Sequence, residues 1–588
     1  MALLAVLLGA AVATHAQTDQ QEAAAEATVL SYRARVTPTG NAELDALLTA
    51  NSGLIALQER APTDAEGLRA RIAAEPERLR PALESEGYWA AQVAIVVESG
   101  GPPQPVLIRV DTGPRYVFRR IETVGTAPIL LRPGQPARAA DVLTAQEAAL
   151  TALRAEARPL ARIERAVTVD HAARAMDIAF TATPGPRADF AYPVVEGTQR
   201  VNPEVVRRVA ALRLAERSFS PERLTRARAD INALGAFSSV RIDTGAALDR
   251  EGSLPVTVIV RERPFRALSA SAAYETNFGL ALRGAWEHRN MLGGAENLRI
   301  ELEASRLGEA FDRTNARAAA TWRQPLPFGF DGTMVGSLAF LRERLDSYDR
   351  DAIVLSLLYE RRLSDRWTVS AGPVGEAGST GPPAEDLKAY QIAGFTMQAR
   401  YDSTDSVLDP RRGIRATGSV TPSYAFAEAT AFAPLRLAAS TYLDLTGEGR
   451  SIVALRGALG SLLNASAETV PQSQRFFAGG GGSVRGYDFR SIGPRDSRNR
   501  PVGGASLVEG SLEFRQRFGS SYGAVAFVDA GSVGTSAAAP TDALRIGAGV
   551  GVRYYTAIGP IRADVAVPLV RQQGSGAFGF YVGIGHAF

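Results

Sequence analysis

The sequence ends with FGFYVGIGHAF (578–588), in which large apolar residues alternate with small ones. The apolar parity consists of Phe578, Phe580, Val582, Ile584 and Phe588. The other parity is rich in glycine and includes Tyr581. A period of two residues is that of a β-strand whose two faces meet different surroundings. The same alternation precedes it at 545–553 and 561–569, so the end of the chain is predicted to be all β.

This alternation, punctuated by glycine-rich turns, extends back to residue 265. About 320 residues follow that point, and at roughly 20 residues per strand and loop they hold about 16 strands, an even number as in outer-membrane barrels. The region 265–588 is therefore predicted to be an all-β transmembrane barrel of antiparallel strands. An exported soluble β-protein is the alternative, because a sandwich has the same period with its apolar face turned inward.

The N-terminus favours the membrane interpretation. MALLAVLLGAAVATHAQ (1–17) contains an apolar run too short to span a bilayer, and small residues precede a possible cut after Ala16. We interpret 1–16 as a secretory signal peptide, with a membrane anchor or a core helix as the alternative, although the usual basic residues before the apolar run are missing. No later window holds 18 uncharged apolar residues, so no transmembrane helix is predicted.

The sequence between these two regions repeats itself. DTGPRYVFRRIETVG (111–125) and TPGPRADFAYPVVEG (183–197) share Gly-Pro-Arg, a following aromatic residue and a glycine, and VRERPF (260–265) is a weaker third copy. Each unit is predicted to have the order β-α-α-β-β, with a Gly-aromatic turn that the second unit replaces with Ala157-Arg158. A tandem array of three small α/β domains is predicted. The predicted bounds are a linker at 17–27 and domains at 28–110, 111–185 and 186–264.

The composition excludes several classes of protein. The chain has no cysteine and only four widely separated histidines, so neither a thiol site nor a histidine metal site is expected. Its 65 basic and 62 acidic residues nearly balance, which argues against nucleic-acid binding. No nucleophile, base and acid are grouped together. We therefore expect no enzyme, no metal and no cofactor.

A glycine run in GGGGSVRGYDF (479–489) suggests a phosphate-binding loop at first sight. A P-loop needs a lysine after its last glycine and lies between a strand and a helix. Neither condition holds here, so phosphate binding is not expected. Taken alone, the stretch is a mobile loop and Arg485 is one of many solvated arginines.

A wider stretch, RFFAGGGGSVRGYDFRSIGPRD (475–496), resembles the sixth extracellular loop of the outer-membrane assembly factor superfamily, which includes BamA and TamA. The hallmark of that loop matches Val484, Arg485, Gly486 and Tyr487. FVDAG (527–531) is similar to the F-x-D-x-G strand of the same family, and the final Phe588 also agrees with it. The tandem α/β units look like the periplasmic POTRA domains of the family. Three units, rather than five or two, together with the FFAGG lead-in, resemble its TamA branch.

The resemblance implies a set of contacts inside the barrel. In the family the loop folds back into the lumen, so Arg485 would meet Glu513 and Asp529 on the inner wall, with Phe527 and Gly531 as the other motif residues beside it. Strand parity independently points Asp529 to the lumen, because a charge facing lipid is costly. An arginine between carboxylates in a confined lumen forms forked, charge-assisted hydrogen bonds.

The family also implies a lateral gate where the first and last strands close the barrel. The predicted gate residues are Leu268, Tyr274, Gly579, Gly583, Gly585 and Phe588. Glycines weaken strand packing and allow a bend. On sequence alone, small residues fit a crowded lumen equally well, and the resemblance favours the gate.

The resemblance implies a protein that assists insertion or secretion of outer-membrane proteins, such as autotransporters, in a Gram-negative outer membrane with its POTRA domains in the periplasm. The implied partners are unfolded outer-membrane proteins, outer-membrane lipid and a TamB-like periplasm-spanning protein that binds the POTRA domains. No nucleic acid is implied. The alternatives are a two-partner secretion pore, which would carry two POTRA domains, and a passive porin-like barrel.

Overall fold

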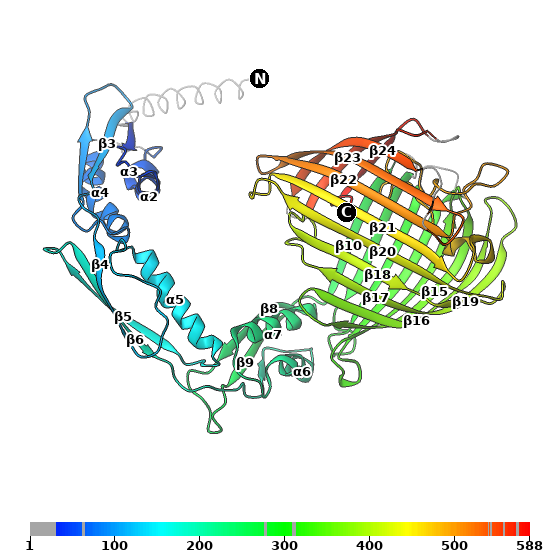
Figure 1. Ribbon diagram of the computed structural model, residues 1–588, viewed down its shortest axis with the longest axis horizontal. Coiled ribbons are helices and arrows are strands. Elements are labelled where there is room, and N and C mark those ends of the chain that lie inside the picture. Colours follow the sequence, from blue (N-terminus) through cyan, green and yellow to red (C-terminus); the bar gives the residue numbers. More distant parts are fainter. Residues whose placement is uncertain are drawn as a thin grey trace, which may run out of the picture. The chain divides into compact units, whose positions relative to one another are not determined.

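The computed structural model describes residues 31–60, 65–275, 279–307, 313–538, 540, 544–556, 559–571 and 576–588 (Figure 1). The predicted signal peptide and linker lie outside these residues. The chain divides into two compact units, one made of residues up to 192 with 214–225 and 244–256, the other of 193–213, 226–243 and 257–588. Within the described ranges, no helix has both the length and the apolar character needed to cross a membrane.

The first α/β sheet has the strand order β1-β3-β2, with β1 parallel to β3. Its elements are β1 (Tyr32–Val36), α2 (Ala42–Asn51), α3 (Gly53–Ala56), α4 (Ala65–Ser85), β2 (Gln92–Val97) and β3 (Gln104–Asp111). Helix α2 begins where the Asn41 side chain accepts hydrogen bonds from the backbone N–H groups of Glu43 and Leu44. Leucines of the helices, such as Leu48 and Leu79, pack against Val106 of the central strand.

The second sheet has the order β4-β6-β5. Its elements are β4 (Val117–Val124), α5 (Ala139–Ala155), β5 (Arg162–Asp170) and β6 (Ala175–Thr183). The predicted β-α-α-β-β order is wrong for this unit, because the described chain between β4 and β5 forms one α-helix. Three prolines, Pro128, Pro133 and Pro136, occupy the stretch before α5, and proline disfavours a helix interior.

The third sheet has the order β7-β9-β8, again with its first strand parallel to its last. Its elements are β7 (Val194–Glu196), α6 (Pro203–Leu214), α7 (Pro221–Ala233), β8 (Phe237–Thr244) and β9 (Val256–Glu262). The Glu262 carboxylate accepts hydrogen bonds from the backbone N–H groups of Gln199, Arg200 and Val201 at 2.8, 2.9 and 2.8 Å. This contact fixes the approach to α6.

The remaining strands close into one antiparallel barrel, drawn from green to red in Figure 1. They are β10 (Arg266–Glu275), β11 (Gly279–His288), β12 (Asn297–Leu307), β13 (Asn315–Pro325), β14 (Thr333–Arg344), β15 (Asp349–Arg362), β16 (Trp367–Gly381), β17 (Lys388–Asp402), β18 (Gly413–Val420), β19 (Ser423–Ala425), β20 (Thr430–Asp444), β21 (Ser451–Leu463), β22 (Ser506–Phe518), β23 (Tyr522–Gly534), β24 (Arg545–Thr556), β25 (Gly559–Pro568) and β26 (Gly579–Ile584). Segments β18 and β19 both lie between β17 and β20, interrupted at Pro422, so they form one strand. The barrel therefore has 16 strands, as predicted.

The barrel turns its apolar side chains outward. In β22, Leu512 and Phe514 are 47% and 42% exposed, whereas Glu513 between them is fully buried. Other strands follow the same parity, with Leu355 and Val550 outside. An apolar outer face around a closed sheet is what a bilayer requires, so the alternative of a soluble β-protein is wrong.

The segment that joins β21 to β22 (464–505) is buried at 484–487 and exposed at 497–499. Two short 3₁₀ helices, Ala467–Thr469 and Gln472–Gln474, open it, and isolated β-bridges join Phe476 to Gly504 and Ala478 to Ile492. Its apolar side chains pack against residues of the barrel wall. The buried cluster includes Phe476, Val484, Tyr487 and Ile492 of the segment and Tyr390, Leu462 and Val533 of the wall. This loop is therefore a packed part of the barrel, and its packing positions the VRGY stretch.

Candidate functional site

Arg485 binds Asp529 through three hydrogen bonds. Its Nε and backbone N donate to Asp529 Oδ2 at 2.7 and 3.1 Å, and its Nη2 donates to Oδ1 at 2.9 Å. Ser511 Oγ donates to the same Oδ1 at 2.5 Å. The side chains of Arg485 and Asp529 are 2% and 1% exposed. This forked, water-excluded pair fixes both the backbone and the side chain of the loop.

Two further carboxylates approach the same guanidinium. Arg485 Nη1 lies 2.8 Å from Glu513 Oε1 and 3.5 Å from Asp564 Oδ2. Each of these acids also has its own arginine, since Arg515 lies 2.9 Å from Glu513 and Arg553 bonds Asp564. Burial disfavours the charged form of Arg485, but the hydrogen bond to Asp529 and the nearby carboxylates outweigh burial and raise its pKa. Each of these buried charges therefore has an opposite charge beside it, which offsets the cost of removing it from water.

Phe527 completes the arginine's surroundings. The guanidinium carbon of Arg485 lies 3.4 Å from the centre of the Phe527 ring, in cation–π geometry. The structure thus brings Arg485 together with Glu513, Phe527 and Asp529. Gly531 instead meets Val484, because a Cβ placed on Gly531 would lie 2.7 Å from Val484 Cγ2.

Gly486 and Tyr487 attach the loop to the last strands. Gly486 has φ +95°, and a Cβ there would lie 2.8 Å from the carbonyl carbon of Val567 in β25, so this close approach requires glycine. Its backbone N–H donates to Tyr581 Oη of β26 at 2.9 Å. The Tyr487 hydroxyl lies 2.6 Å from the carbonyl oxygen of Val570. The loop is therefore connected directly to β26.

Glycines of β24 form the surface on which the loop lies. A Cβ on Gly547 would overlap the carbonyl oxygen of Arg485, and one on Gly551 would overlap Asp564 Oδ1. A Cβ on Gly549 would overlap the Phe527 ring. At these three positions the inner face of β24 has room for backbone alone.

Sequence reasoning missed several residues of this site: Ser511, Gly547, Arg553, Asp564 and Tyr581. Parity would have placed Ser511 inside, because it lies two residues before Glu513. Asp564 alternates with outward apolar residues in the same way, so parity would also have marked it. Gly547 and Tyr581 required the register between strands, which parity does not supply.

The seam between the first and last strands is short. Within the described residues, β10 and β26 share two register pairs, Tyr274 with Val582 and Glu275 with Tyr581. On its other edge, β10 pairs with β11 along its whole length, from Arg266 to Glu275. Most of the described length of β10 therefore has no partner strand on its seam edge.

The predicted gate residues do not all lie at the seam between β10 and β26. Tyr274 lies at the seam, while Leu268 pairs with Trp286 of β11 and is 85% exposed. Gly579 and Gly583 pair with β25, opposite Ala566 and Arg562. They flank the seam without contributing to its register.

The end of the chain departs from the predicted strand. Strand β26 ends at Ile584, and Gly585 then takes φ +93°. His586 Nε2 lies 3.1 Å from Asp409 Oδ1, and Arg515 Nη2 donates to the Phe588 backbone oxygen at 3.1 Å. The Phe588 ring packs on a cluster that contains Tyr442, Ile452 and Ala454. Phe588 was predicted within the last strand, and this is wrong because contacts with the inner wall turn the last residues inward.

A family model described as the Omp85 superfamily domain matches residues 290–588, which are 299 of the 588 residues. Two curated proteins named outer membrane protein assembly factor BamA are similar to the chain. The one from Nitratidesulfovibrio vulgaris is 24% identical over 420 residues, covering 66% of this chain and 50% of the relative. The one from Neorickettsia risticii is 23% identical over 410 residues, covering 65% and 52%. The chain thus spans about half the length of these relatives.

Solved structures show the same fold at low identity. BamA from Haemophilus ducreyi lacking POTRA domains 1–3 matches with a TM-score of 0.63 and 16% identity, covering 80% of this chain and all of that one. CdiB from Acinetobacter baumannii matches with a TM-score of 0.51 and 11% identity, covering 80% and 90%. Both likenesses concern the fold alone.

Proposed function

The chain belongs to the Omp85 superfamily, and from that premise we propose that it assists insertion or secretion of other outer-membrane proteins, autotransporters among them. Its barrel lies in the outer membrane. This insertion or secretion requires no covalent chemistry. It needs a barrel wall that opens sideways, so that an incoming strand can pair with an exposed edge.

The short seam is the observation that carries this proposal. A closed barrel normally leaves no strand edge unpaired, because each edge residue exposes backbone hydrogen-bonding groups. Here β26 covers two residues of β10, Tyr274 and Glu275, among the described residues. Few hydrogen bonds then oppose separation of the two strands, and the freed edge of β10 offers a template for a substrate strand.

The anchored loop is the second part of the proposal. Gly486 binds Tyr581, and Tyr581 is the residue of β26 that pairs with Glu275 of β10. Arg485, one residue earlier, is held by Asp529 of β23. We infer that the loop sets the position of β26 at the seam, so that the Arg485–Asp529 pair restrains the movement of the gate.

A TamA-type role is the finer proposal. It is supported by the three α/β sheets before the barrel, and we propose POTRA domains with the bounds 28–110, 111–185 and 186–264. In the first sheet, β1 and β2 are edge strands, which suit strand addition by a TamB-like periplasm-spanning partner. Unfolded outer-membrane proteins are the proposed substrates.

Disulfide locking of the seam tests the gate. The chain contains no cysteine, so Tyr274→Cys with Val582→Cys introduces a single pair across β10 and β26. Cells that depend on this protein for autotransporter assembly are expected to lose most of that assembly under oxidising conditions. Reductant should restore it.

The matched control joins strands that the proposal leaves together. Ala563→Cys with Val582→Cys places a disulfide between β25 and β26, sharing one cysteine with the test variant. Assembly should continue in this control. Equal assembly by the two oxidised variants would contradict a lateral gate.

A two-partner secretion pore is the second candidate, supported by the likeness to CdiB. Such a pore passes its substrate through the lumen, so seam locking would spare secretion, whereas a fixed loop 464–505 would block it. A passive porin-like barrel agrees less well with a lumen in which Val484, Arg485 and Tyr487 are buried.

A further inference from the structure

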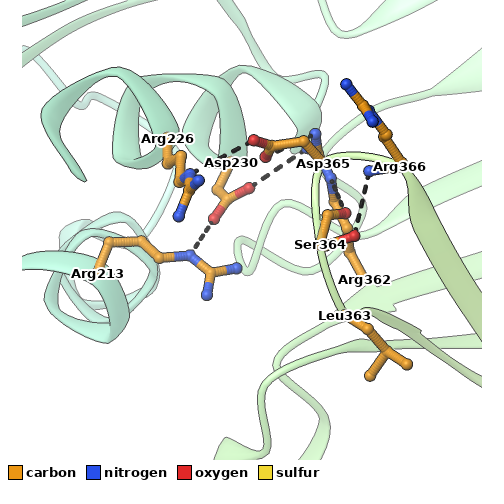
Figure 2. A pocket seen from close by; sticks show the side chains of 8 residues that line it. All are labelled: Arg213, Arg226, Asp230, Arg362, Leu363, Ser364, Asp365 and Arg366. Carbon is orange, nitrogen blue, oxygen red and sulfur yellow. Dashed lines mark hydrogen bonds and ion pairs between the residues drawn. The ribbon is translucent and has the colours of Figure 1, made fainter. Parts of the chain in front are cut away.

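A pocket of about 370 Å³ lies where the turn between β15 and β16 meets helices α6 and α7 (Figure 2). All of its lining residues belong to the compact unit that contains the barrel. Four arginines line it: Arg213 of α6, Arg226 of α7, Arg362 at the end of β15, and Arg366 of the turn. Its acidic lining residues are Asp230 and Asp365.

The two aspartates engage three of the four arginines. Asp230 lies 2.6 Å from Arg213 and 3.7 Å from Arg362, and Asp365 lies 3.5 Å from Arg226. Among the described residues, no carboxylate lies within ion-pair distance of the Arg366 guanidinium, whereas the other three arginines are paired. A third carboxylate, Asp331, lies 3.9 Å from Arg213. Four cations against three anions still leave a positive excess, which favours an anionic ligand.

Neighbouring side chains place this pocket at the level of lipid headgroups. Trp367 follows Arg366 directly, faces Tyr401 across the β16–β17 pair with ring centres 5.1 Å apart, and is 45% exposed. Leu363, which also lines the pocket, is 58% exposed. Exposed aromatic residues at the end of barrel strands mark the membrane–water interface. Arg366 therefore lies directly beside an aromatic residue of the membrane–water interface.

We propose that this pocket binds the phosphate of a phospholipid in the periplasmic leaflet. Arg366 and Arg226 would hold the phosphate oxygens, since guanidinium groups match phosphate geometry. Leu363 and Trp367 would contact the start of the acyl chains. A bound lipid would join α7 to the β15–β16 turn, and this inference does not depend on the proposed assembly function.

Native mass spectrometry of the full chain in detergent, with added phosphatidylglycerol, tests the site. Arg366→Gln combined with Arg226→Gln is expected to weaken lipid binding by at least about fivefold, because two charge-assisted contacts are lost. The matched control is Arg450→Gln, an exposed arginine on the β20–β21 turn outside the pocket. Semi-native gel mobility verifies that each barrel is folded. Equal lipid binding by the double variant and the control would overturn the proposal.

Two further probes identify the ligand. Diacylglycerol, which has the acyl chains without the phosphate, should not bind the wild-type pocket. Inorganic phosphate should fail to displace phosphatidylglycerol at equal concentration. Displacement by inorganic phosphate, lost in the double variant, would assign the pocket to free phosphate and overturn the lipid assignment.

Discussion

At the scale of single residues, the molecule concentrates its buried charge around Arg485. Side chains from four strands surround it or its neighbour Gly486: Glu513 of β22, Asp529 of β23, Asp564 of β25 and Tyr581 of β26. A loop residue with partners on this many strands holds both the loop and the wall in one arrangement.

Removing the guanidinium should destabilise the barrel. Arg485→Ala leaves three buried carboxylates without the cation between them, and loss of one partner from a buried ion pair costs about 3–5 kcal/mol. Arg485→Lys keeps the charge without the fork and should give an intermediate result. The measurement is the temperature at which the purified barrel loses its compact mobility on semi-native gels.

Arg498→Ala is the control for that series. Arg498 belongs to the same loop, is 68% exposed and pairs with Glu385 at the surface, so its removal should change the transition little. Identical transitions for Arg485→Ala and Arg498→Ala would show that the buried contacts do not stabilise the barrel.

Glu262 gives a prediction with a pH dependence. Burial raises the pKa of this carboxyl group, but three backbone N–H donors outweigh burial and lower it. A lowered folded-state pKa means that the stabilisation is fully present above the ordinary value of 4.5 and is lost as pH falls through the folded-state pKa below it. Glu262→Gln should therefore destabilise the third sheet by about 1–2 kcal/mol at pH 7, by analogy with loss of a helix cap.

Hydrogen exchange of residues 194–262 in the full chain measures this effect. The difference between wild type and Glu262→Gln should shrink as the pH is lowered below 4.5. Glu196→Gln, on an exposed position of β7, should exchange as wild type does at every pH. A difference that grows toward low pH would contradict the assignment.

At the scale of elements, the three α/β units have the same left-handed turn after their last helix, and two of them have glycine there. Gly87 and Gly235 close the last helix of the first and third units at φ +89° and +74°, and Ala157 occupies the same place in the second at φ +62°. A side chain in this left-handed region is strained by about 1–2 kcal/mol. The chain tolerates that strain in the second unit.

Ala157→Gly should stabilise the second unit by about 1 kcal/mol, because glycine adopts this conformation without strain. Thermal unfolding of the α/β region, followed by circular dichroism, provides the measurement. Ala152→Gly, inside α5, should destabilise by a similar amount, since glycine disfavours a helix interior. If both substitutions shift the midpoint in the same direction, the strain argument fails.

Strand alternation predicted much of this architecture. It placed Asp529 on the inner wall because Asp529 lies on the strand face opposite Ala526 and Val528, and the number of strands followed from length. Two features were not predicted, namely the single helix of the second unit and the inward turn after Ile584. The single helix depends on prolines spread through the stretch before α5, a stretch that is helical in the other two units. The inward turn depends on Arg515 and Asp409, which are distant in sequence and become neighbours of the last residues only after the barrel closes.

At the scale of the whole molecule, the last residues of the chain have two possible partners, the seam edge of β10 and the inner wall of the barrel. Continuing the antiparallel register from Tyr274 and Val582 would bring Ala272 opposite Ile584 and Leu268 opposite Phe588. The structure holds Phe588 on Arg515 and the Tyr442 cluster instead. Inward docking of the last residues therefore opposes lengthening of the seam.

Phe588→Ala should shift that balance toward the paired seam, because it removes most of the apolar contact with the inner wall. The rate of disulfide formation between Ala272→Cys and Ile584→Cys should rise at least about threefold in this background. Phe518→Ala, which truncates an exposed aromatic residue of β22, serves as the control. An unchanged rate would mean that the inward turn does not restrain the seam.

The glycine face of β24 has a consequence for how this sequence can vary. At Gly547, Gly549 and Gly551 even a methyl group would overlap the docked loop or its partners, whereas Val550 and Val552 point outward and are more than 60% exposed. A complete scan of single substitutions, scored by the amount of folded protein at the cell surface, should show a stripe along one side of this strand where alanine is already rejected. The alternate positions should accept any large apolar residue, so mutational tolerance along β24 should itself rise and fall with a period of two.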